Sequence, residues 1–382
     1  MSGDKNPKKK KRRLAGLALS IIPLAALTYI AIMLISGRDL GLTRFLGLFS
    51  SGETVEWAYE YNFDVGRGRV FADLDSAVAS AGTLGIQVID YGGDETFRDS
   101  FRMTDPAINA FGERAVAFDI GGKAVRVFDA NGITAAFDAE GAVVAATINE
   151  NGWFCVCAQD IEGFKGAVTV FNNAGKDVYK VKIASGYVLS AVLSPDNRRL
   201  AILVLTDNGS RIIYYSLNSE DVGNTFDMPG GLILEIRYSP GGDMLAITTD
   251  SLIAVDKDGA QKELYDFSGR RLGGYSLDGA LIALHLLDYG VGYGGRLVTF
   301  GNDGEYLGMI ATYRDIISMS SENRTLAVLR SDGLFFYDAE LNEIPQTGHF
   351  ESTAGINRVL SLGGGAVLIA GDHSAVVISD GS

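Results

Sequence analysis

Short apolar runs, separated by polar turns, fill most of this sequence and recur in a fixed order. Residues 188–228 show one complete unit: VLSAVLS, the turn PDNRR, LAILVL, the turn DNGS, RIIYYSL, the turn NSED and a weaker run near NTFDM. Runs of this length, rich in β-branched and aromatic residues and bounded by turn formers, predict β-strands. We therefore expect each unit to form four successive strands.

The unit repeats along the chain. The phrase LSPDNRRLAILVL at Leu193 has relatives that begin at Tyr238, Tyr275 and Met319. The third run of each unit can be aligned on its last apolar residue, and successive positions are 37 to 45 residues apart. The aligned residues are Ile89, Phe128, Phe171, Tyr215, Val255, Phe300, Tyr337 and Ile378. A strand-rich period of about 40–45 residues is typical of propeller blades. The sequence thus predicts an all-β fold, an eight-bladed β-propeller, with a seven-bladed ring as the alternative.

The last unit ends without a fourth run, and a segment before the first unit could supply it. In residues 54–63, TVEWAYEYNF, large apolar residues alternate with polar or small ones, which is the period-2 pattern of a strand. We expect this N-terminal strand to pair with Ala375–Ser379 and so to close the ring. Closure removes the open sheet edges that invite aggregation.

The N-terminal part has a different composition. Residues 1–13 carry seven Lys or Arg and one Asp, a net charge of +6, and the following 22 residues, Leu14–Ile35, carry no charge. An apolar run of this length can cross a bilayer, and positive flanks stay in the cytoplasm. We predict a cytoplasmic tail (1–13), a transmembrane helix (14–36), a linker (37–52) and an extracytoplasmic propeller (53–382). A cleaved signal peptide and a buried core helix are the alternatives.

Charge and cysteine content narrow the choice of partners. Beyond residue 13 the chain has 26 basic and 46 acidic residues, a net charge of −20, which disfavours nucleic acid because phosphate contacts need Lys and Arg. The two cysteines, Cys155 and Cys157, are two residues apart and would point to the same face of a strand. They are poorly placed for a disulfide, and we expect them to be buried as small apolar residues.

No motif in the sequence names a reaction. There is no G-x-S-x-G elbow, and the three histidines are scattered over different units without a metal spacing. The glycines of GVGYGG at 290–295 match a dinucleotide motif, but a strand follows them where that motif needs a helix. The calcium-like segments DKDG and NDGE are expected to be tight hairpin turns. We therefore expect no cofactor, no metal and no enzymatic activity.

Two connections between second and third strands are longer than the others and are candidates for a binding site. They are Ala158–Ala167 and Leu287–Arg296, and in a propeller both should open on the same face of the ring. Insertions on one face of a repeat array often mark its binding face, and aromatic residues suit recognition. The candidate binding residues are Asp160, Phe164, Lys165, Asp288, Tyr289 and Tyr293.

The phrase SPDNRRLAILV resembles the S-P-D-G-K-x-L-A repeat of TolB-type and WD40-like propellers, most clearly at Ser194–Leu203 and Ser239–Ile247. Taken whole, the chain resembles a family of Gram-positive bacterial proteins that combine a basic N-terminus, one membrane helix and a propeller-like ectodomain. This resemblance implies fold and location but no activity. We favour a binding or scaffolding module for a protein or envelope ligand. A glycan-active enzyme that uses two channel carboxylates and a sensor of a propeller ligand are the alternatives.

Overall fold

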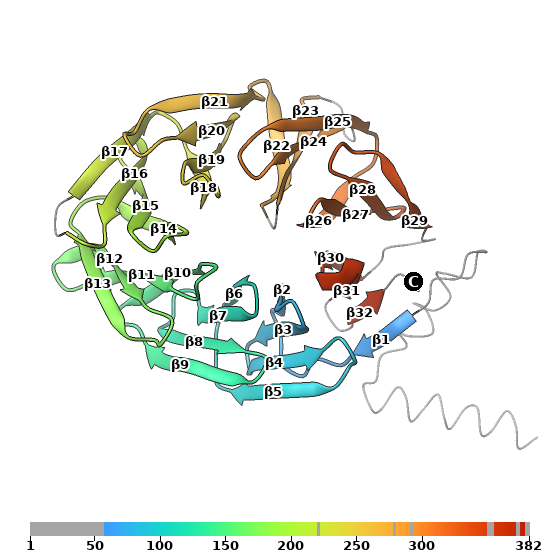
Figure 1. The fold of residues 1–382 in the computed structure, drawn as a ribbon, viewed down its shortest axis with the longest axis horizontal. Helices are drawn as coiled ribbons and strands as arrows, with labels where there is room; N and C mark the ends of the chain where they lie inside the picture. The colour runs from blue at the N-terminus through green and yellow to red at the C-terminus, as the bar shows by residue number, and fades with distance from the viewer. Residues whose placement is uncertain are drawn as a thin grey trace, which may run out of the picture. The chain divides into compact units, whose positions relative to one another are not determined.

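The computed structural model describes residues 57–219, 222–277, 280–290, 294–349, 355–371 and 375–378. These residues form eight four-stranded antiparallel sheets, arranged as blades around a central channel (Figure 1). The predicted eight-bladed β-propeller is therefore confirmed. Each blade runs from an inner strand at the channel to an outer strand at the rim. Each of the eight aligned third runs lies in the third strand of its blade.

The strands occur in the same order in every blade. The inner, first strands are β2 (Val70–Asp73), β6 (Pro106–Phe111), β10 (Ala142–Ile148), β14 (Tyr187–Leu193), β18 (Ile233–Tyr238), β22 (Arg270–Ser276), β26 (Ile316–Glu322) and β30 (Ile356–Ser361). The second strands are β3 (Ala77–Gly82), β7 (Arg114–Asp119), β11 (Phe154–Ile161), β15 (Arg199–Thr206), β19 (Met244–Thr248), β23 (Leu281–Asp288), β27 (Thr325–Arg330) and β31 (Val367–Gly371).

The third strands are β4 (Gly85–Asp90), β8 (Ala124–Asp129), β12 (Phe164–Phe171), β16 (Gly209–Ser216), β20 (Ser251–Val255), β24 (Gly295–Gly301), β28 (Gly333–Asp338) and β32 (Ala375–Ile378). The outer, fourth strands of blades one to seven are β5 (Glu95–Ser100), β9 (Gly132–Asp138), β13 (Asp177–Ile183), β17 (Val222–Pro229), β21 (Gln261–Asp266), β25 (Tyr306–Thr312) and β29 (Glu343–His349). Blade eight is completed by β1 (Trp57–Tyr61).

Ring closure occurs as the sequence predicts. β1 pairs antiparallel with β32, with Trp57 opposite Ile378 and Tyr61 opposite Ala375. Tyr61 is buried, stacks on Phe63 at a ring distance of 5.7 Å and donates its hydroxyl to the carbonyl of Asp90 in blade one, at 2.9 Å. The N-terminal strand therefore joins the last blade to the first and leaves no open blade in the ring.

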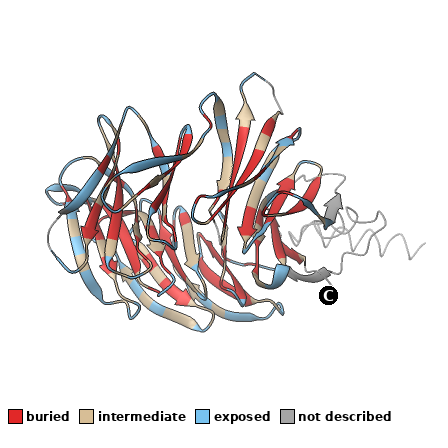
Figure 2. Cartoon of the chain, turned by 45° about the horizontal axis from the view of Figure 1, so that its top comes forward, coloured by how far each residue is buried: buried red, intermediate tan, exposed pale blue. Residues whose placement is uncertain are grey.

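The core lies between blades. Second and third strands are buried along nearly their whole length, and the outer strands alternate between partly buried and exposed residues (Figure 2). Apolar residues of neighbouring blades share clusters, one of which joins Cys155 and Val168 of blade three to Leu200 of blade four. Removing such a side chain from water contributes about 1.5–3 kcal/mol, so each blade depends on the next for its stability. Both cysteines are free and buried, as predicted.

The Ser-Pro-Asp-Asn turn shows why the repeat keeps its polar residues. The Ser194 hydroxyl donates to Asp196 at 2.6 Å and accepts the backbone N–H of Arg199 at 2.9 Å. Asn197 has a positive φ of 55°, a conformation that asparagine tolerates better than most residues. The amide of Asn149 in blade three donates to Ser194 O at 3.2 Å. The repeated turn therefore also fastens one blade to its neighbour.

The antiparallel order gives the ring two distinct faces. One end of the ring carries the turns between second and third strands, together with the links from each fourth strand to the first strand of the next blade. We call this end the link face. The other turns lie at the opposite face. Because Trp57 pairs with the last residue of β32, the chain enters the ring at the opposite face.

Several predictions concern residues outside the described ranges, namely the tail (1–13), the span (14–36) and the linker (37–52). Within the described part of the chain, no helix has the length and hydrophobicity to span a membrane.

Candidate binding face

The first predicted loop, Ala158–Ala167, is wrong in its conformation. β11 and β12 remain paired as far as Ile161 and Phe164, so only a two-residue turn connects them. Glu162 and Gly163 reverse the chain, Gly163 with a positive φ of 77°, and Asp160 has a positive φ of 57° within β11. Polar residues and glycine are common both in long loops and in tight hairpin turns, so the composition of this segment could not distinguish the two.

The hairpin nevertheless exposes an aromatic and cationic cluster on the link face. Phe164 is 37% exposed and Tyr187, the first residue of β14, is 49% exposed. The Lys165 ammonium lies 5.3 Å from the Tyr187 ring centre, and that of Lys182 lies 5.0 Å from the Phe164 ring centre. Each cation–π contact at an exposed site stabilises the position of its ring by about 0.5–1 kcal/mol of interaction free energy. The candidates Phe164 and Lys165 are therefore brought together with two residues that sequence reasoning missed.

The second predicted loop, in blade six, is confirmed as a longer connection. β23 ends at Asp288 and β24 begins at Gly295. Tyr289 is 69% exposed in this connection, whereas Tyr293 lies outside the described residues. Asp288 accepts a hydrogen bond from Arg270 Nε at 2.8 Å, so this candidate fastens the connection to the inner strand. Asp160 is exposed on the hairpin of blade three, three blades from this connection and not beside it.

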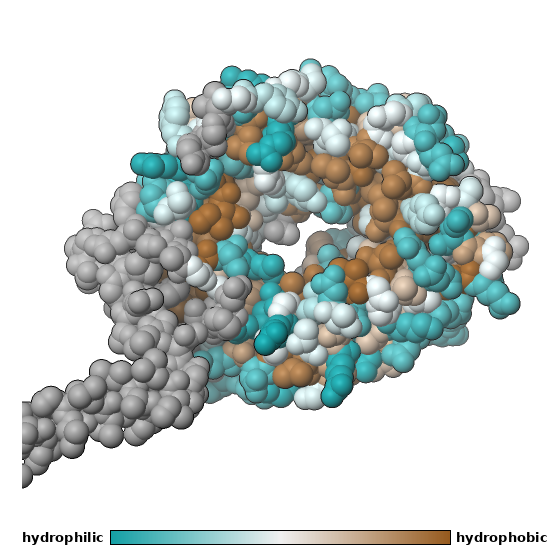
Figure 3. Space-filling model, turned by 180° about the vertical axis from the view of Figure 1, so that it is seen from behind, coloured by the Kyte–Doolittle hydropathy of each residue, from teal (hydrophilic) through white to brown (hydrophobic). Residues whose placement is uncertain are grey.

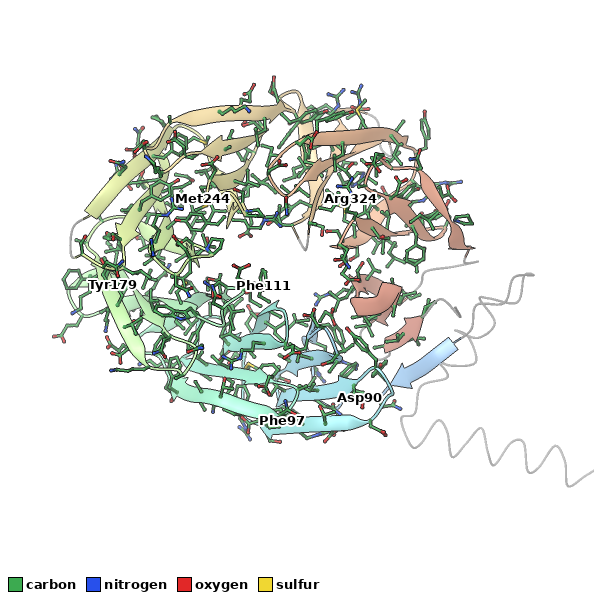
Figure 4. All side chains as sticks on the ribbon, viewed as in Figure 1. Asp90, Phe97, Phe111, Tyr179, Met244 and Arg324 are labelled. Atoms are coloured by element: carbon green, nitrogen blue, oxygen red, sulfur yellow. The ribbon has the colours of Figure 1, made fainter. Side chains whose placement is uncertain are left out.

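Most of the described large apolar residues that are exposed lie on the link face. Those at this end of the ring are Leu84, Ile120, Phe164, Tyr187, Leu189, Leu232, Leu234, Tyr289, Tyr313 and Ile317. Those elsewhere are Phe111, Val178, Tyr306 and Met309, of which Phe111 lies beside the channel at the end of β6 (Figure 4). Figure 3 shows hydrophobic residues gathered along the rim of the channel. Exposed apolar residues that gather in this way mark interaction sites.

A repeated β-bulge produces much of this exposure. Six inner strands carry a register shift close to their first residue, and each shift skips one residue of the inner strand. The skipped residues are Val144, Leu189, Leu234, Gly273, Ile317 and Asn357, which we call the bulge ring. Leu189, Leu234 and Ile317 are 38%, 41% and 38% exposed. Bulges turn side chains away from the regular pleat, and here they present aliphatic residues at the mouth of the channel. In four of these strands, a pair of apolar residues that breaks the period-2 pattern at the start of the first run was the available sequence signal.

The residue after each bulge faces the next blade, and two of these residues are charged. Burial raises the pKa of the Glu235 carboxyl, whose Oε2 accepts a hydrogen bond from the Tyr275 hydroxyl at 3.4 Å. Burial lowers the pKa of the Arg358 guanidinium, which donates to the carbonyl of Arg69 at 3.4 Å. Among the residues that the structure describes, neither forms an ion pair. The channel mouth therefore has an acidic and a basic side chain, both largely removed from water, below an aliphatic rim.

Carboxylates near the channel on the opposite face are engaged in the contact between blades eight and one. The Tyr91 hydroxyl donates to Asp73 Oδ1 at 2.5 Å, and Gly363 N donates to Asp73 Oδ2 at 3.1 Å. Burial raises the pKa of Asp73, and burial with Asp73 beside it raises that of Tyr91. Both carboxylate oxygens of Asp73 accept hydrogen bonds, so this residue links blade one to blade eight. Within the described ranges no group of His, Cys, Asp and Glu is arranged to hold a metal ion.

A cleft of about 190 Å³ lies between blades two and three. Its apolar wall comes from β11 and β12, and the ring of Phe137 in β9 lies 4.9 Å from that of Phe171. Lys180 in β13 forms an ion pair with Glu140 of the neighbouring link. The cleft is small, and this ion pair lies along its polar side.

Comparisons with known proteins agree with this architecture. Residues 51–269 match the model of a family of unknown function (DUF5711), which covers more than half of the chain, and the protein belongs to that family. Among proteins of curated function, none matches the sequence.

Solved structures give the fold. The C-terminal WD40 domain of Sif2 is similar over 86% of this chain and 99% of its own, with a TM-score of 0.60 and 12% sequence identity. A streptogramin B lyase structure covers 84% of this chain and 96% of its own, with a TM-score of 0.48 and 10% identity. At 12% identity the likeness to the Sif2 domain shows a β-propeller of the WD40-like kind and nothing of its ligand.

Proposed function

We propose that this protein is a membrane-anchored, extracytoplasmic binding module whose link face receives a partner protein or an envelope ligand. The observation that carries the proposal is the bulge ring, because three exposed aliphatic residues recur at the same position of separate blades. Exposed aliphatic side chains do not contribute to the stability of the propeller. Contact with a partner would remove that apolar area from water, at about 25 cal/mol per Å².

The aromatic and cationic cluster beside the ring supports the same face. Phe164 and Tyr187 lie at the link-face ends of β12 and of the inner strand β14, and each is covered on one side by a lysine. Aromatic anchors with a polar rim are typical of protein interfaces. The cluster therefore extends the binding face from the channel mouth across blades three and four.

The N-terminal segment supports a membrane tether. The +6 tail and the uncharged span indicate an anchor with its N-terminus in the cytoplasm. Within the ring, β1 begins at the opposite face, and the link face lies at the other end of the blades.

The test is site-specific crosslinking in cells that make the full chain. A photocrosslinking amino acid replaces Leu234 in the bulge ring, and in a matched variant it replaces Phe111, which is 53% exposed beside the channel at the opposite face. We expect a discrete crosslinked product from position 234 and none from position 111. Equal products from both positions, or none from position 234 in any growth phase, would show that the link face is not the binding face.

A further inference from the structure

The cleft between blades two and three is open because blade three has small side chains where other blades have long ones. Ala167 and Thr169 in β12 both line it. Counted from the aligned last apolar residue of each third strand, Arg126 of blade two stands at the position of Thr169. Blades four and six have an arginine at the position of Ala167, namely Arg211 and Arg296. Blade three therefore lacks the long cation that three other blades carry on this face.

Arg126 shows what an arginine does at such a place. Its Nε atom donates to Asp99 of blade one at 3.3 Å, and its guanidinium carbon lies 4.4 Å from the centre of the Phe101 ring. Asp99 belongs to β5, and Phe101 follows directly after that strand. The arginine thus reaches from its own blade to a carboxylate and an aromatic ring of the blade before it.

The cleft offers the same two kinds of group without an arginine. Phe137 and Asp138, at the end of β9 in blade two, line its wall, and the ring of Phe137 lies 4.9 Å from that of Phe171. Three further lining residues form a small apolar cluster apart from the one that joins blades two and three: Ala158, Ile161 and Ala167. The volume of about 190 Å³ is below the roughly 300–1,000 Å³ of small-molecule pockets, and it suits one long side chain.

The lining of the cleft has an excess of negative charge. It contains the ammonium of Lys180 and three carboxylates, those of Asp138, Glu140 and Asp177. Lys180 forms an ion pair with Glu140, and Lys123 Nζ donates to the backbone carbonyl of Glu140 at 3.0 Å. Among the residues that the structure describes, Asp138 and Asp177 have no ion pair. Two carboxylates are therefore available to a cation that enters the cleft.

A guanidinium group fits this lining better than an ammonium group. It is planar, stacks on aromatic faces, pairs with carboxylates through a fork of N–H donors and is less strongly hydrated. The aliphatic part of an arginine side chain would lie along Ala158 and Ala167, since long charged side chains bury their stems on apolar surface. Arginine is also enriched in protein interfaces.

We propose that this cleft receives an arginine side chain of the partner protein, in the way that Arg126 fills its place between blades one and two. The inference rests on the proposed function, and it makes the partner a protein with an exposed arginine. The cleft adjoins the aromatic and cationic cluster, because Lys182 follows Lys180 by two residues in β13 and its ammonium lies 5.0 Å from the Phe164 ring centre. The arginine anchors the partner at the side of the link face that blades two and three form.

A thiol placed in the cleft tests its charge. Thr169→Cys introduces the thiol into the full chain, held in a non-ionic detergent. The native thiols react little because Cys155 and Cys157 are buried, and burial raises the pKa of Cys155 to about 11 and that of Cys157 as well. Relative to free cysteine, a trimethylammonium methanethiosulfonate should react about tenfold faster than its sulfonate analogue. Ile213→Cys, at the same position of blade four and close to Arg211, is the matched control and should lack this preference.

An arginine derivative then stands in for the partner. Nα-acetyl-arginine amide should slow the modification of Thr169→Cys to saturation, whereas the neutral citrulline derivative of the same shape should leave the rate unchanged. Changing Asp138 and Asp177 together to Asn should abolish both the reagent preference and the protection. Ala139→Cys, at another lining residue, serves if Thr169→Cys folds poorly by circular dichroism. Equal reagent rates, no protection by the arginine derivative, equal protection by citrulline, or protection that survives the double variant overturns the proposal.

A second variant connects the cleft to the partner in cells. Thr169→Arg fills the cleft with an arginine of the chain itself, and Thr169→Val is the uncharged control. We expect Thr169→Arg to abolish the crosslinked product of position 234 and Thr169→Val to leave it unchanged. If both variants leave that product unchanged, the cleft proposal fails and the binding face stands. If the arginine derivative protects the cleft but position 234 never crosslinks, docking over the bulge ring fails and the cleft remains an arginine site.

Discussion

Trp57 lies opposite Ile378 in the pairing of β1 with β32, so the first and last described strands are neighbours in one blade. This pairing makes the propeller a closed ring of eight blades. It also means that the stability of the last blade depends on a segment at the other end of the chain. Loss of that segment would expose the backbone edge of β32 and open the cluster that contains Tyr61 and Val377.

We predict that the closing strand is essential to the fold. Deleting residues 53–63 from the full chain should unfold or aggregate the propeller, whereas deleting residues 38–50 should leave its melting transition unchanged. The point variant Tyr61→Ala should lower the free energy of unfolding by about 3–5 kcal/mol, because Tyr61 is 2% exposed. Tyr313→Ala, at a residue 79% exposed, is the control and should change it by less than about 0.5 kcal/mol. Thermal melts followed by circular dichroism decide the matter, and similar melts for the two deletions would contradict closure.

The bulge ring should be dispensable for stability. Leu234→Ser should change the free energy of unfolding by no more than about 0.5 kcal/mol, because this side chain is 41% exposed. Ile236→Ala in the same strand should cost about 2–5 kcal/mol, because Ile236 is 2% exposed. Urea unfolding of both variants compares them directly. A large loss from Leu234→Ser would mean that the exposed leucine supports the fold and would weaken the case for a binding face.

His285 should make the fold sensitive to acid. Its pKa is lowered by burial from the ordinary value of 6.5, so the unfolded chain binds the proton more readily than the folded one. The free energy of unfolding therefore falls as the pH drops below about 6.5 and recovers as the pH rises again. His285→Leu should remove this contribution and raise stability at neutral pH by about 1–3 kcal/mol, since it also removes an unpaired buried group.

The reciprocal variant in blade four tests the same reasoning. Leu203→His places an imidazole at the equivalent buried position, beneath Leu189 in place of a glycine. We expect it to destabilise the protein and to introduce a new loss of stability below pH 6.5. Unfolding curves at several pH values measure both variants. A wild-type pH profile unchanged in His285→Leu would show that another group governs the acid response.

The propeller should lie outside the cell. Protease added to protoplasts should remove the propeller and leave a short N-terminal fragment, because we expect the basic tail to keep the N-terminus in the cytoplasm. A tag at residue 2 and a second tag after residue 382 report the two parts separately. Lysis with detergent before protease treatment is the control and should expose the tail as well. Complete protection of the C-terminal tag in intact protoplasts would contradict the predicted topology.

Much of the fold could be predicted because each blade is encoded locally. The third runs that end at Ile89 and Phe300 differ in almost every residue, yet both become third strands, since period, turn residues and apolar character are enough to specify a blade. The closing strand was predictable for the same reason, as its alternating pattern lacked a partner in its own neighbourhood. The prediction of a loop at Ala158–Ala167 was wrong. Residues with positive φ, here Asp160 and Gly163, occur in tight hairpins as well as in longer loops, so the sequence did not distinguish the two.

The sequence by itself determined the all-β class and the strand that closes the ring and favoured eight blades over seven, because these depend on local pattern and on its repetition. Only the tertiary structure decided which side chains meet. Leu234 becomes exposed through a bulge, which depends on the register of β18 against β19. His285 is packed closely against Gly273 and Gly295, which lie on the two strands that pair with β23. Register and cross-strand contacts arise only when strands pair, so the candidate site could be read only after the blades had been assembled.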